Sequence, residues 1–178
     1  GSEEILIYHH AIASPAAEVF RRFRGRQVLI FHNITPAGFF RRTDPYTFIQ
    51  CRRGRRYLQK LIPSCDLAIA LSDFSARELR QTGFPGVKVI PFPFDEKRLE
   101  GPAERRLFTD LSGRNDPRLL FVGRLSPNKR QEDILTAFAA YQRYYRPGAG
   151  LCLIGPQNFA AYTRRLEELI RRLNINSV

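Results

Sequence analysis

Two basic side chains and a glycine stand where an apolar run gives way to a helical pattern. The run LLFV (119–122) is followed by Gly123, Arg124, a Ser-Pro-Asn turn and Lys129. If Ser126 caps a helix, Gly123 leaves room for a ligand, Arg124 offers a two-toothed set of N–H donors, and Lys129 adds a mobile charge. Helix N-termini of this kind bind phosphate, so the pattern predicts a diphosphate site. A solvated turn or a hinge fits the same residues, because the spacing matches neither a Walker loop nor a dinucleotide-binding glycine motif.

Such a site requires strands that alternate with helices, and the hydrophobic pattern provides them. Short apolar runs without polar alternation predict strands that are buried on both faces. Amphipathic stretches between the runs predict helices, and the alternation predicts an α/β fold with parallel, Rossmann-like sheets. The runs are ILIY (5–8), VLIF (28–31), LAIAL (67–71), VKVI (87–90), LLFV (119–122) and LCLI (151–154).

Capping residues and apolar faces locate the helices more closely. Asp44-Pro45 and Ser126-Pro127 mark two helix starts, and Ser75 with Glu78 has the spacing of a capping box. Ser72 fits a cap better than a ligand contact. Two apolar faces are expected, one formed by Ile134, Phe138, Tyr141 and Tyr145 and the other by Tyr162, Leu166, Leu169, Ile170 and Leu173.

A stretch rich in proline, glycine and charge interrupts the alternation and predicts a division into two domains. Residues 3–95 form the first expected domain, 96–117 the linker, and 118–178 the second. The second domain contains only two predicted strands, which are few for an independent sheet.

The charge balance indicates anionic partners. The formal net charge is +12, and arginine supplies most of it, so nucleic acid, acidic lipid and phosphorylated substrates are all electrostatically suitable. The stretch FFRRTDPYTFIQCRRGRR (39–56) combines arginines with aromatic residues. It could bind an anionic membrane surface, a lipid-phosphate acceptor or nucleic acid, or it could be a solvated basic helix. No RNA-binding or helix-turn-helix signature accompanies it, which makes a nucleic-acid partner the weaker alternative.

Cysteine usage and hydropathy indicate a cytoplasmic protein. Cys51, Cys65 and Cys152 are odd in number and lie in apolar surroundings, so they are expected to be reduced thiols of the core. No apolar stretch reaches the roughly 20 residues of a membrane span, and no signal-peptide pattern is present. No Asp-x-Asp pair or His/Cys cluster indicates a metal.

Four stretches, in order, resemble retaining glycosyltransferases of family 4, which have the GT-B fold. FVGRLSPNKRQEDILTAF followed by LCLIGP is similar to the first half of the family's C-terminal, donor-binding domain. DLAIALSDFSARELRQTGFPGVKVIPFPFD, HHAIASP and FHNITPAGFF are similar to the second half of its N-terminal, acceptor-side domain. The resemblance covers nearly the whole chain and implies a partial GT-B fold.

The resemblance assigns roles to individual residues. It implies that Gly123, Arg124 and Lys129 bind the diphosphate of a nucleotide-sugar donor and that His32 is the catalytic histidine of the cleft. His9, His10, Asn33 and Gly155 also follow strands and could line the cleft, although a histidine at a strand end is often only a structural hydrogen-bond donor. The substrates would be a nucleoside diphosphate sugar and a saccharide or lipid-linked acceptor, without a further cofactor.

The family pattern also contains parts that this sequence lacks. Its glycine-rich loop and its paired glutamates have no counterpart here, so we expect a central fragment that is inactive alone and could self-associate through exposed sheet edges. The expected setting is bacterial glycan or lipid-linked saccharide synthesis, in the cytoplasm or at the inner face of the membrane. Two alternatives remain: a basic module that binds anions without catalysis, and a scaffold protein that oligomerises.

Overall fold

The computed structural model describes residues 4–102 and 116–175, apart from the side chains of residues 98 and 99. Within it the chain divides into two compact units, Gly1–Phe94 (unit 1) and Asp95–Val178 (unit 2). Of the predicted linker 96–117, residues 96–99 form the short 3-10 turn η3 (Glu96–Leu99), and residues 103–115 lie outside the described part of the chain.

Unit 1 is built on a parallel sheet whose strands follow one another in space as they do in sequence, in the order β1-β2-β3-β4. The expected alternation of strand and helix is confirmed. β4 is much shorter than the predicted run 87–90, and α2 begins at the predicted Asp44-Pro45 start, where Asp44 accepts a hydrogen bond from the Thr47 N–H (3.0 Å). The elements are β1 (Ile5–His10), α1 (Ala16–Arg22), β2 (Arg26–Phe31), η1 (Ala37–Phe40), α2 (Pro45–Leu61), η2 (Ile62–Ser64), β3 (Leu67–Ala70), α3 (Asp73–Thr82) and β4 (Lys88–Val89).

The interpretation of Ser72 as a cap is confirmed at the start of helix α3, which begins at Asp73. The hydroxyl of Ser72 accepts the N–H of Ser75 (3.3 Å), so Ser72 is the cap and the predicted capping box of Ser75 and Glu78 is wrong. Gly83 ends the helix with φ +100°, a conformation that glycine adopts readily. The buried core of unit 1 includes Phe20, Leu29, Phe31, Leu58, Leu61 and Leu79.

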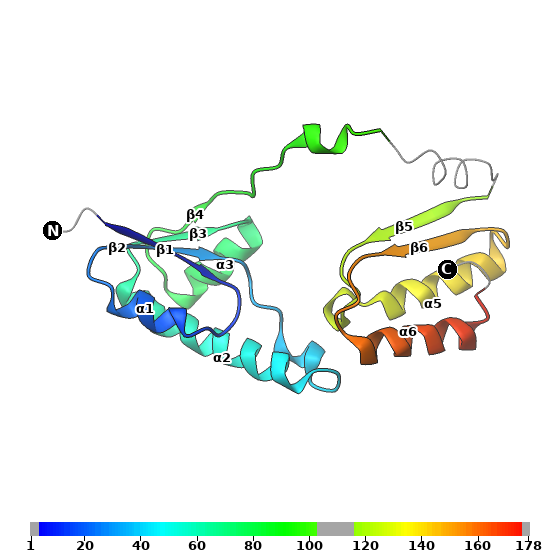
Figure 1. Ribbon diagram of the computed structural model, residues 1–178, viewed down its shortest axis with the longest axis horizontal. Coiled ribbons are helices and arrows are strands. Elements are labelled where there is room, and N and C mark those ends of the chain that lie inside the picture. The colour runs from blue at the N-terminus through cyan, green and yellow to red at the C-terminus, as the bar shows by residue number, and fades with distance from the viewer. Residues whose placement is uncertain (1–3, 103–115, 176–178) are drawn as a thin grey trace. The chain divides into compact units, whose positions relative to one another are not determined.

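Unit 2 contains a parallel strand pair with α5 and α6 on the same side of it (Figure 1). The elements are β5 (Arg118–Val122), η4 (Pro127–Lys129), α5 (Gln131–Tyr144), β6 (Gly150–Ile154) and α6 (Ala160–Leu173). The α6 face is confirmed, whereas Tyr145 of the predicted α5 face lies beyond the helix and is 74% exposed. The buried core of unit 2 comprises Leu135, Phe138, Ala149, Leu151, Tyr162, Leu166 and Ile175.

The prediction that the strands are buried on both faces is wrong for the described residues. In β1 the side chains of Ile5 and Ile7 are 60% and 55% exposed, and in β5 those of Leu120 and Val122 are 63% and 70% exposed. The reason is that within each unit the described helices cover one face of the sheet. The same face of β6 leaves Cys152 exposed, so of the three thiols only Cys51 and Cys65 belong to the core.

Candidate functional site

The carboxyl ends of β5 and β6 are joined by backbone contacts that fix the loop after β5. The Gly123 N–H donates to the Ile154 carbonyl (2.8 Å), and the Leu125 N–H donates to the Pro156 carbonyl (3.0 Å). A Cβ at Gly155 would overlap the carbonyl of Gly123. Gly155 is therefore required by the close approach of the protein's own backbone, which is a reason separate from the predicted approach of a ligand.

Arg124 extends from this fixed loop with its charge uncompensated. Its side chain is exposed, its guanidinium lies over the ring of Phe159 (5.8 Å to the centroid), and it forms no ion pair with a described acidic residue. The carbonyl of Arg124 accepts a hydrogen bond from the buried side chain of Gln131 (3.0 Å), which holds the backbone of the loop. The guanidinium can therefore bind an anion without first breaking a salt bridge.

Lys129 lies in the same loop, but the helix start predicted at Ser126 is wrong. Ser126-Pro127 opens the 3-10 turn η4 instead, and the Ser126 hydroxyl donates to the side chain of Asn128 (2.8 Å) rather than capping a helix. Lys129 is the last residue of η4, is exposed, and has no acidic partner among the described residues. Both cations thus belong to the loop between β5 and α5, and neither lies within α5.

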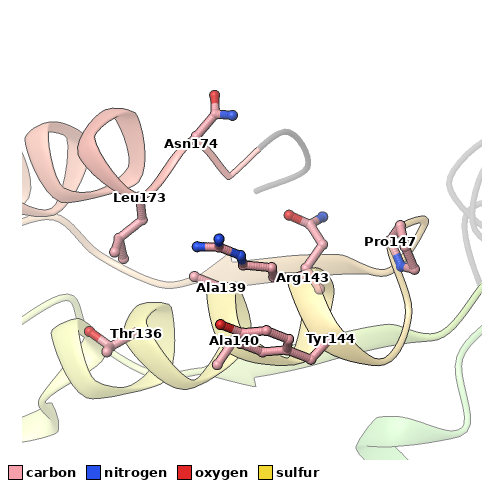
Figure 2. A pocket seen from close by; sticks show the side chains of 9 residues that line it. Thr136, Ala139, Ala140, Arg143, Tyr144, Pro147, Leu173 and Asn174 are labelled. Atoms are coloured by element: carbon pink, nitrogen blue, oxygen red, sulfur yellow. The ribbon is translucent and has the colours of Figure 1, made fainter.

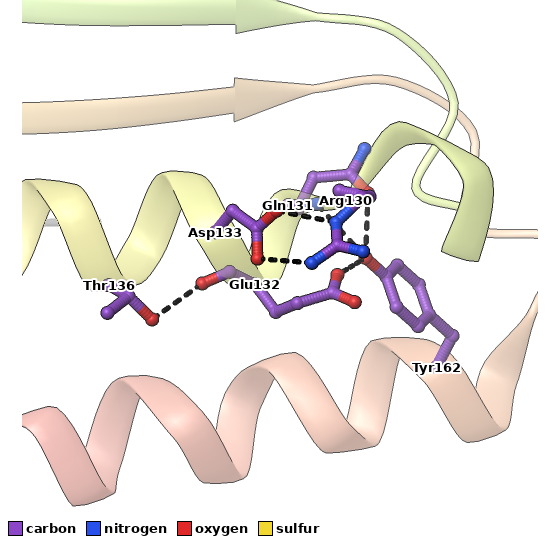
Figure 3. Close-up of polar contacts among 6 residues, drawn as sticks. All are labelled: Arg130, Gln131, Glu132, Asp133, Thr136 and Tyr162. Carbon is purple, nitrogen blue, oxygen red and sulfur yellow. Dashed lines mark hydrogen bonds and ion pairs between the residues drawn. The ribbon is translucent and has the colours of Figure 1, made fainter.

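Side chains of unit 2 form hydrogen bonds and an ion pair at the N-terminus of α5 (Figure 3). The Tyr162 hydroxyl accepts the N–H of Gln131 (3.0 Å) and contacts the carboxylate of Glu132. Burial and the hydrogen bond to Glu132 raise the pKa of Tyr162, so the hydroxyl remains protonated. Arg130, in the left-handed conformation at φ 52°, forms an ion pair with Asp133 (2.5 Å).

This arrangement means that the N-terminus of α5 is not the group expected to bind phosphate. The first N–H of α5 is occupied by Tyr162, and the first turn carries the acidic residues Glu132 and Asp133. Phosphate is disfavoured next to these carboxylates and cannot use the occupied N–H. An anion at this edge would have to be held by the side chains of Arg124 and Lys129, and by the backbone of their loop.

In unit 1, two histidines meet at the carboxyl ends of β1 and β2. Nδ1 of His9 and Nε2 of His32 lie 2.7 Å apart, which makes the two rings one hydrogen-bonded pair. The ring of Phe92 packs on His32 (5.6 Å between centroids). Desolvation, with a smaller contribution from His9, lowers the pKa of His32, so at neutral pH its ring is uncharged and able to accept a proton.

His10 and Asn33 have structural environments. His10 is fully buried, accepts a hydrogen bond from the Tyr8 hydroxyl at Nδ1 (3.2 Å), and donates from Nε2 to the carbonyl of Gly54 (3.0 Å). Asn33 adopts φ 62°, a left-handed conformation that asparagine tolerates better than most residues. Burial lowers the pKa of His10, which keeps its ring neutral. Of the two neighbouring histidines at the end of β1, His9 is thus exposed and His10 is buried. The alternation of side chains between the two faces of a strand could have indicated this.

The sequence-predicted residues are therefore brought together in two groups. Gly123, Arg124, Lys129 and Gly155 lie at the strand ends of unit 2, and His32 lies beside Asn33 and His9 in unit 1. Away from these edges, a hollow of about 560 Å³ lies at the opposite end of unit 2, between the C-terminal ends of α5 and α6 (Figure 2). Its lining contains Arg143 and no histidine or carboxylate.

The described residues contain neither a cluster of three or more histidine, cysteine or acidic side chains suited to a metal nor a helix long and apolar enough to cross a membrane.

Part of the basic stretch 39–56 has a structural role, because Arg55 pairs with Glu78 of α3 and donates to the Ile34 carbonyl (2.5 Å).

Comparisons with known proteins identify the fold. No protein-family model and no curated protein matches the chain. Solved structures do: HepE from Anabaena in complex with UDP and glucose is 24% identical with a TM-score of 0.62, and covers 86% of this chain and 40% of its own. The trehalose-6-phosphate protein from E. coli bound with UDP-2-fluoro glucose is 16% identical with a TM-score of 0.66, and the match covers 96% of this chain and 44% of that protein. Sucrose-phosphate synthase from Thermosynechococcus elongatus is 17% identical with a TM-score of 0.60, and the match covers 90% of this chain and 40% of that protein.

These neighbours are GT-B glycosyltransferases, and the chain has the fold of part of a GT-B protein. It spans about two fifths of the length of the structures it matches, as the 40% and 44% coverages indicate. At these identities the likeness concerns the fold.

Proposed function

We propose that the chain is part of an enzyme that transfers a sugar from a nucleoside diphosphate sugar to an acceptor, with Arg124 and Lys129 binding the diphosphate. The observation that carries the proposal is the pair of exposed cations in the loop at the carboxyl end of β5, neither of which has an acidic partner among the described residues. Ligands of open parallel sheets bind at this edge. The neighbours that contain UDP and glucose or UDP-2-fluoro glucose support the choice of ligand.

The two cations suit the chemistry of the donor. As the bond between C1 of the sugar and the diphosphate oxygen breaks, negative charge grows on the departing nucleoside diphosphate. A guanidinium and an ammonium placed beside that charge stabilise the transition state more than the bound donor. By comparison with other preorganised donors, each contributes about 2–4 kcal/mol to transition-state stabilisation.

His32 is the proposed catalytic residue of the acceptor side, acting together with His9. The acceptor hydroxyl oxygen forms the new bond to C1, and its proton must leave. The lowered pKa of His32 keeps its ring neutral, so a ring nitrogen is free of a proton and can accept the proton of the hydroxyl or orient the sugar. Unit 1 would then be the acceptor side and unit 2 the donor-binding side.

The finer assignments follow the family resemblance. They are hexosyl transfer with retention of the anomeric configuration by attack on the same face, and a place in bacterial glycan or lipid-linked saccharide synthesis in the cytoplasm or at the inner face of the membrane. Self-association through the sheet edges at β1 and β4 is a further expectation, and the anomer of the product tests the stereochemistry.

Isothermal titration with UDP tests the proposal. Arg124→Ala and Lys129→Ala each remove a charged hydrogen bond, so we expect each to weaken binding by about tenfold or more. Arg143→Ala, which removes the same charge at the other end of α5, is the matched control and should leave the affinity within about twofold. Equal affinity in all four proteins would contradict the assignment.

A second candidate function is a basic module that binds anions without catalysis. The net charge of +12 and the basic face of α2 favour it. Such a module would bind UDP no better than inorganic pyrophosphate, because it would not recognise the nucleoside.

A further inference from the structure

A groove on unit 1 lies between α2 and the loop that joins β1 to α1. It encloses about 680 Å³, which is in the size range of sites for small ligands. Residues 13–15 of the loop form one wall. The other wall is one face of α2, with the side chains of Tyr46, Gln50, Arg53, Arg56, Tyr57 and Lys60. We refer to this hollow as the α2 groove.

Helix α2 is fixed against the end of β1 and the loop that follows it by hydrogen bonds to its backbone carbonyls. The Ala13 N–H donates to the carbonyl of Gln50 (3.3 Å), and the buried His10 donates to the carbonyl of Gly54 (3.0 Å). Gly54 permits this approach, because a Cβ there would lie 2.9 Å from the Ala13 nitrogen. The groove is therefore formed before any ligand arrives, which reduces the entropy lost on binding.

The charge of the groove is uncompensated. Helix α2 contains four arginines and a lysine but no aspartate or glutamate, and of these cations Arg55 is the one that pairs with Glu78. Within the described part of the chain, Arg53, Arg56 and Lys60 have no acidic partner, and no acidic residue lines the groove. Like charges three and four residues apart on a helix repel each other. A bound anion would remove that repulsion.

We propose that the α2 groove binds a phosphate-bearing ligand. Arg53 and Arg56 lie one helical turn apart, so their planar guanidinium groups can each donate a pair of hydrogen bonds to neighbouring phosphate oxygens. Lys60, whose ammonium lies over the ring of Tyr57 (5.3 Å to the centroid), supplies a third charge. The Ser14 hydroxyl and the Tyr46 ring also line the groove and would contact the remainder of the ligand.

The ligand is a small phosphate group rather than a nucleic acid. The three cations line one hollow of about 680 Å³, which is in the size range of a site for a small ligand and too small for a polynucleotide backbone. The two sources of such chemistry are a phosphorylated small molecule and the headgroup of an anionic lipid. The site lies wholly in unit 1 and does not depend on the donor site proposed at Arg124.

The experiment is an NMR titration of the full chain carrying Arg124→Ala, which disables the proposed donor site, with inorganic pyrophosphate as the probe. We expect saturable shifts of the side-chain Nε–H signals of Arg53 and Arg56. Arg53→Gln/Arg56→Gln should weaken binding by at least about tenfold, because two charged hydrogen-bonding groups are lost. Arg164→Gln/Arg165→Gln, which removes two charges from the exposed face of α6, should change it by less than about twofold.

The proposal is overturned if the α2 signals do not move, or if both double variants weaken binding equally, because the effect is then one of net charge. Arg53→Lys/Arg56→Lys keeps the charge and the fold but removes the planar forks. It should bind pyrophosphate with intermediate affinity, and unchanged affinity would contradict the role of the forks.

Two further probes distinguish the sources. Glucose 6-phosphate that shifts the same signals supports a phosphorylated small molecule. Co-sedimentation with vesicles of phosphatidylcholine and phosphatidylglycerol, but not phosphatidylcholine alone, supports a lipid headgroup if Arg53→Gln/Arg56→Gln abolishes it. Binding confined to single-stranded RNA would overturn the assignment.

Discussion

At the scale of single residues, Tyr162 determines what the N-terminus of α5 can bind. Its hydroxyl accepts the N–H of Gln131 and contacts the carboxylate of Glu132, so the first N–H of the helix already has an acceptor within the protein. At the proposed diphosphate site, the cations of the preceding loop would interact with the ligand through their side chains. In this proposal the side chains of Arg124 and Lys129 contribute more to phosphate binding, and the dipole of α5 contributes less, than at a phosphate site formed by a helix N-terminus.

Tyr162→Phe tests this role of the hydroxyl. The substitution leaves the buried Gln131 N–H without its acceptor, so we expect α5 to lose about 1–3 kcal/mol of stability. Native-state hydrogen exchange of the α5 amides measures the loss. Tyr144→Phe removes a hydroxyl from a side chain that is 70% exposed and serves as the control, with no expected change. Equal protection in both variants would show that the contact contributes nothing.

His10 makes the stability of unit 1 depend on pH. Burial lowers its pKa below the ordinary 6.5, so the unfolded chain binds a proton more readily than the folded one. The contribution of neutral His10 to the free energy of unfolding is therefore complete above pH 6.5 and is lost as the pH falls toward the folded pKa. The free energy of unfolding falls by up to about 1.4 kcal/mol per pH unit in this range.

His10→Gln provides the test, because its amide can still donate to Gly54 and accept from Tyr8 but does not titrate. Urea unfolding between about pH 7 and pH 5 should show a shallower loss of stability in the variant. His32, whose pKa is also lowered, accounts for part of the remaining slope. An identical pH dependence in the two proteins would exclude His10 as its source.

At the scale of elements, the contact between α2 and the β1–α1 loop holds unit 1 together and shapes the α2 groove. Gly54→Ala places a methyl group 2.9 Å from the Ala13 nitrogen and 3.1 Å from the Ile12 carbonyl carbon. Alanine is the better helix former by about 1 kcal/mol, but the backbone cannot move cheaply, so we expect a net loss of about 1–2 kcal/mol. Thermal unfolding checks this.

Gly38→Ala is the matched control, because a Cβ at Gly38 meets no atom within 4 Å. Its melting temperature should stay close to that of the unmodified chain. If Gly54→Ala were equally stable, the loop and the helix would be less tightly packed than their hydrogen bonds indicate.

The elements also show how far sequence reasoning extends. Apolar runs separated by amphipathic stretches predicted the parallel α/β fold, because the spacing of apolar residues depends on local geometry. The start of α5 was mispredicted because Ser126-Pro127 resembles a cap, whereas the real start depends on Tyr162, which is 31 residues away. Gln131 and Gln142 are buried and bind the carbonyls of Arg124 and Ala149, and no polar pattern marks such residues as core.

The histidines show what a simple rule could have added. Side chains of a strand alternate between its faces, so His9 and His10 cannot both face the same side. Tyr8 and His10 share a buried face, which leaves His9 exposed beside His32. The pairing with His32 itself depends on the strand register, in which His9 lies opposite Ile30 and His10 opposite Phe31, and this was not readable from either segment alone.

At the scale of the whole molecule, non-specific binding of anions by the net charge of +12 must be distinguished from specific binding of a nucleotide. Non-specific binding of single-stranded RNA through about six or more phosphate contacts should weaken by at least about three-hundredfold between roughly 50 and 200 mM salt. UDP held by two cations should lose about tenfold or less over the same range. Fluorescence anisotropy with both ligands measures the two slopes, and parallel slopes would favour the basic anion-binding module.

The measurement that tests the central claim most directly is a crystal structure of the chain with UDP. We predict density for the diphosphate at the carboxyl end of β5, with its oxygens within hydrogen-bonding distance of the Arg124 guanidinium and the Lys129 ammonium. A diphosphate found elsewhere, with both of these side chains directed into solvent, would contradict the account.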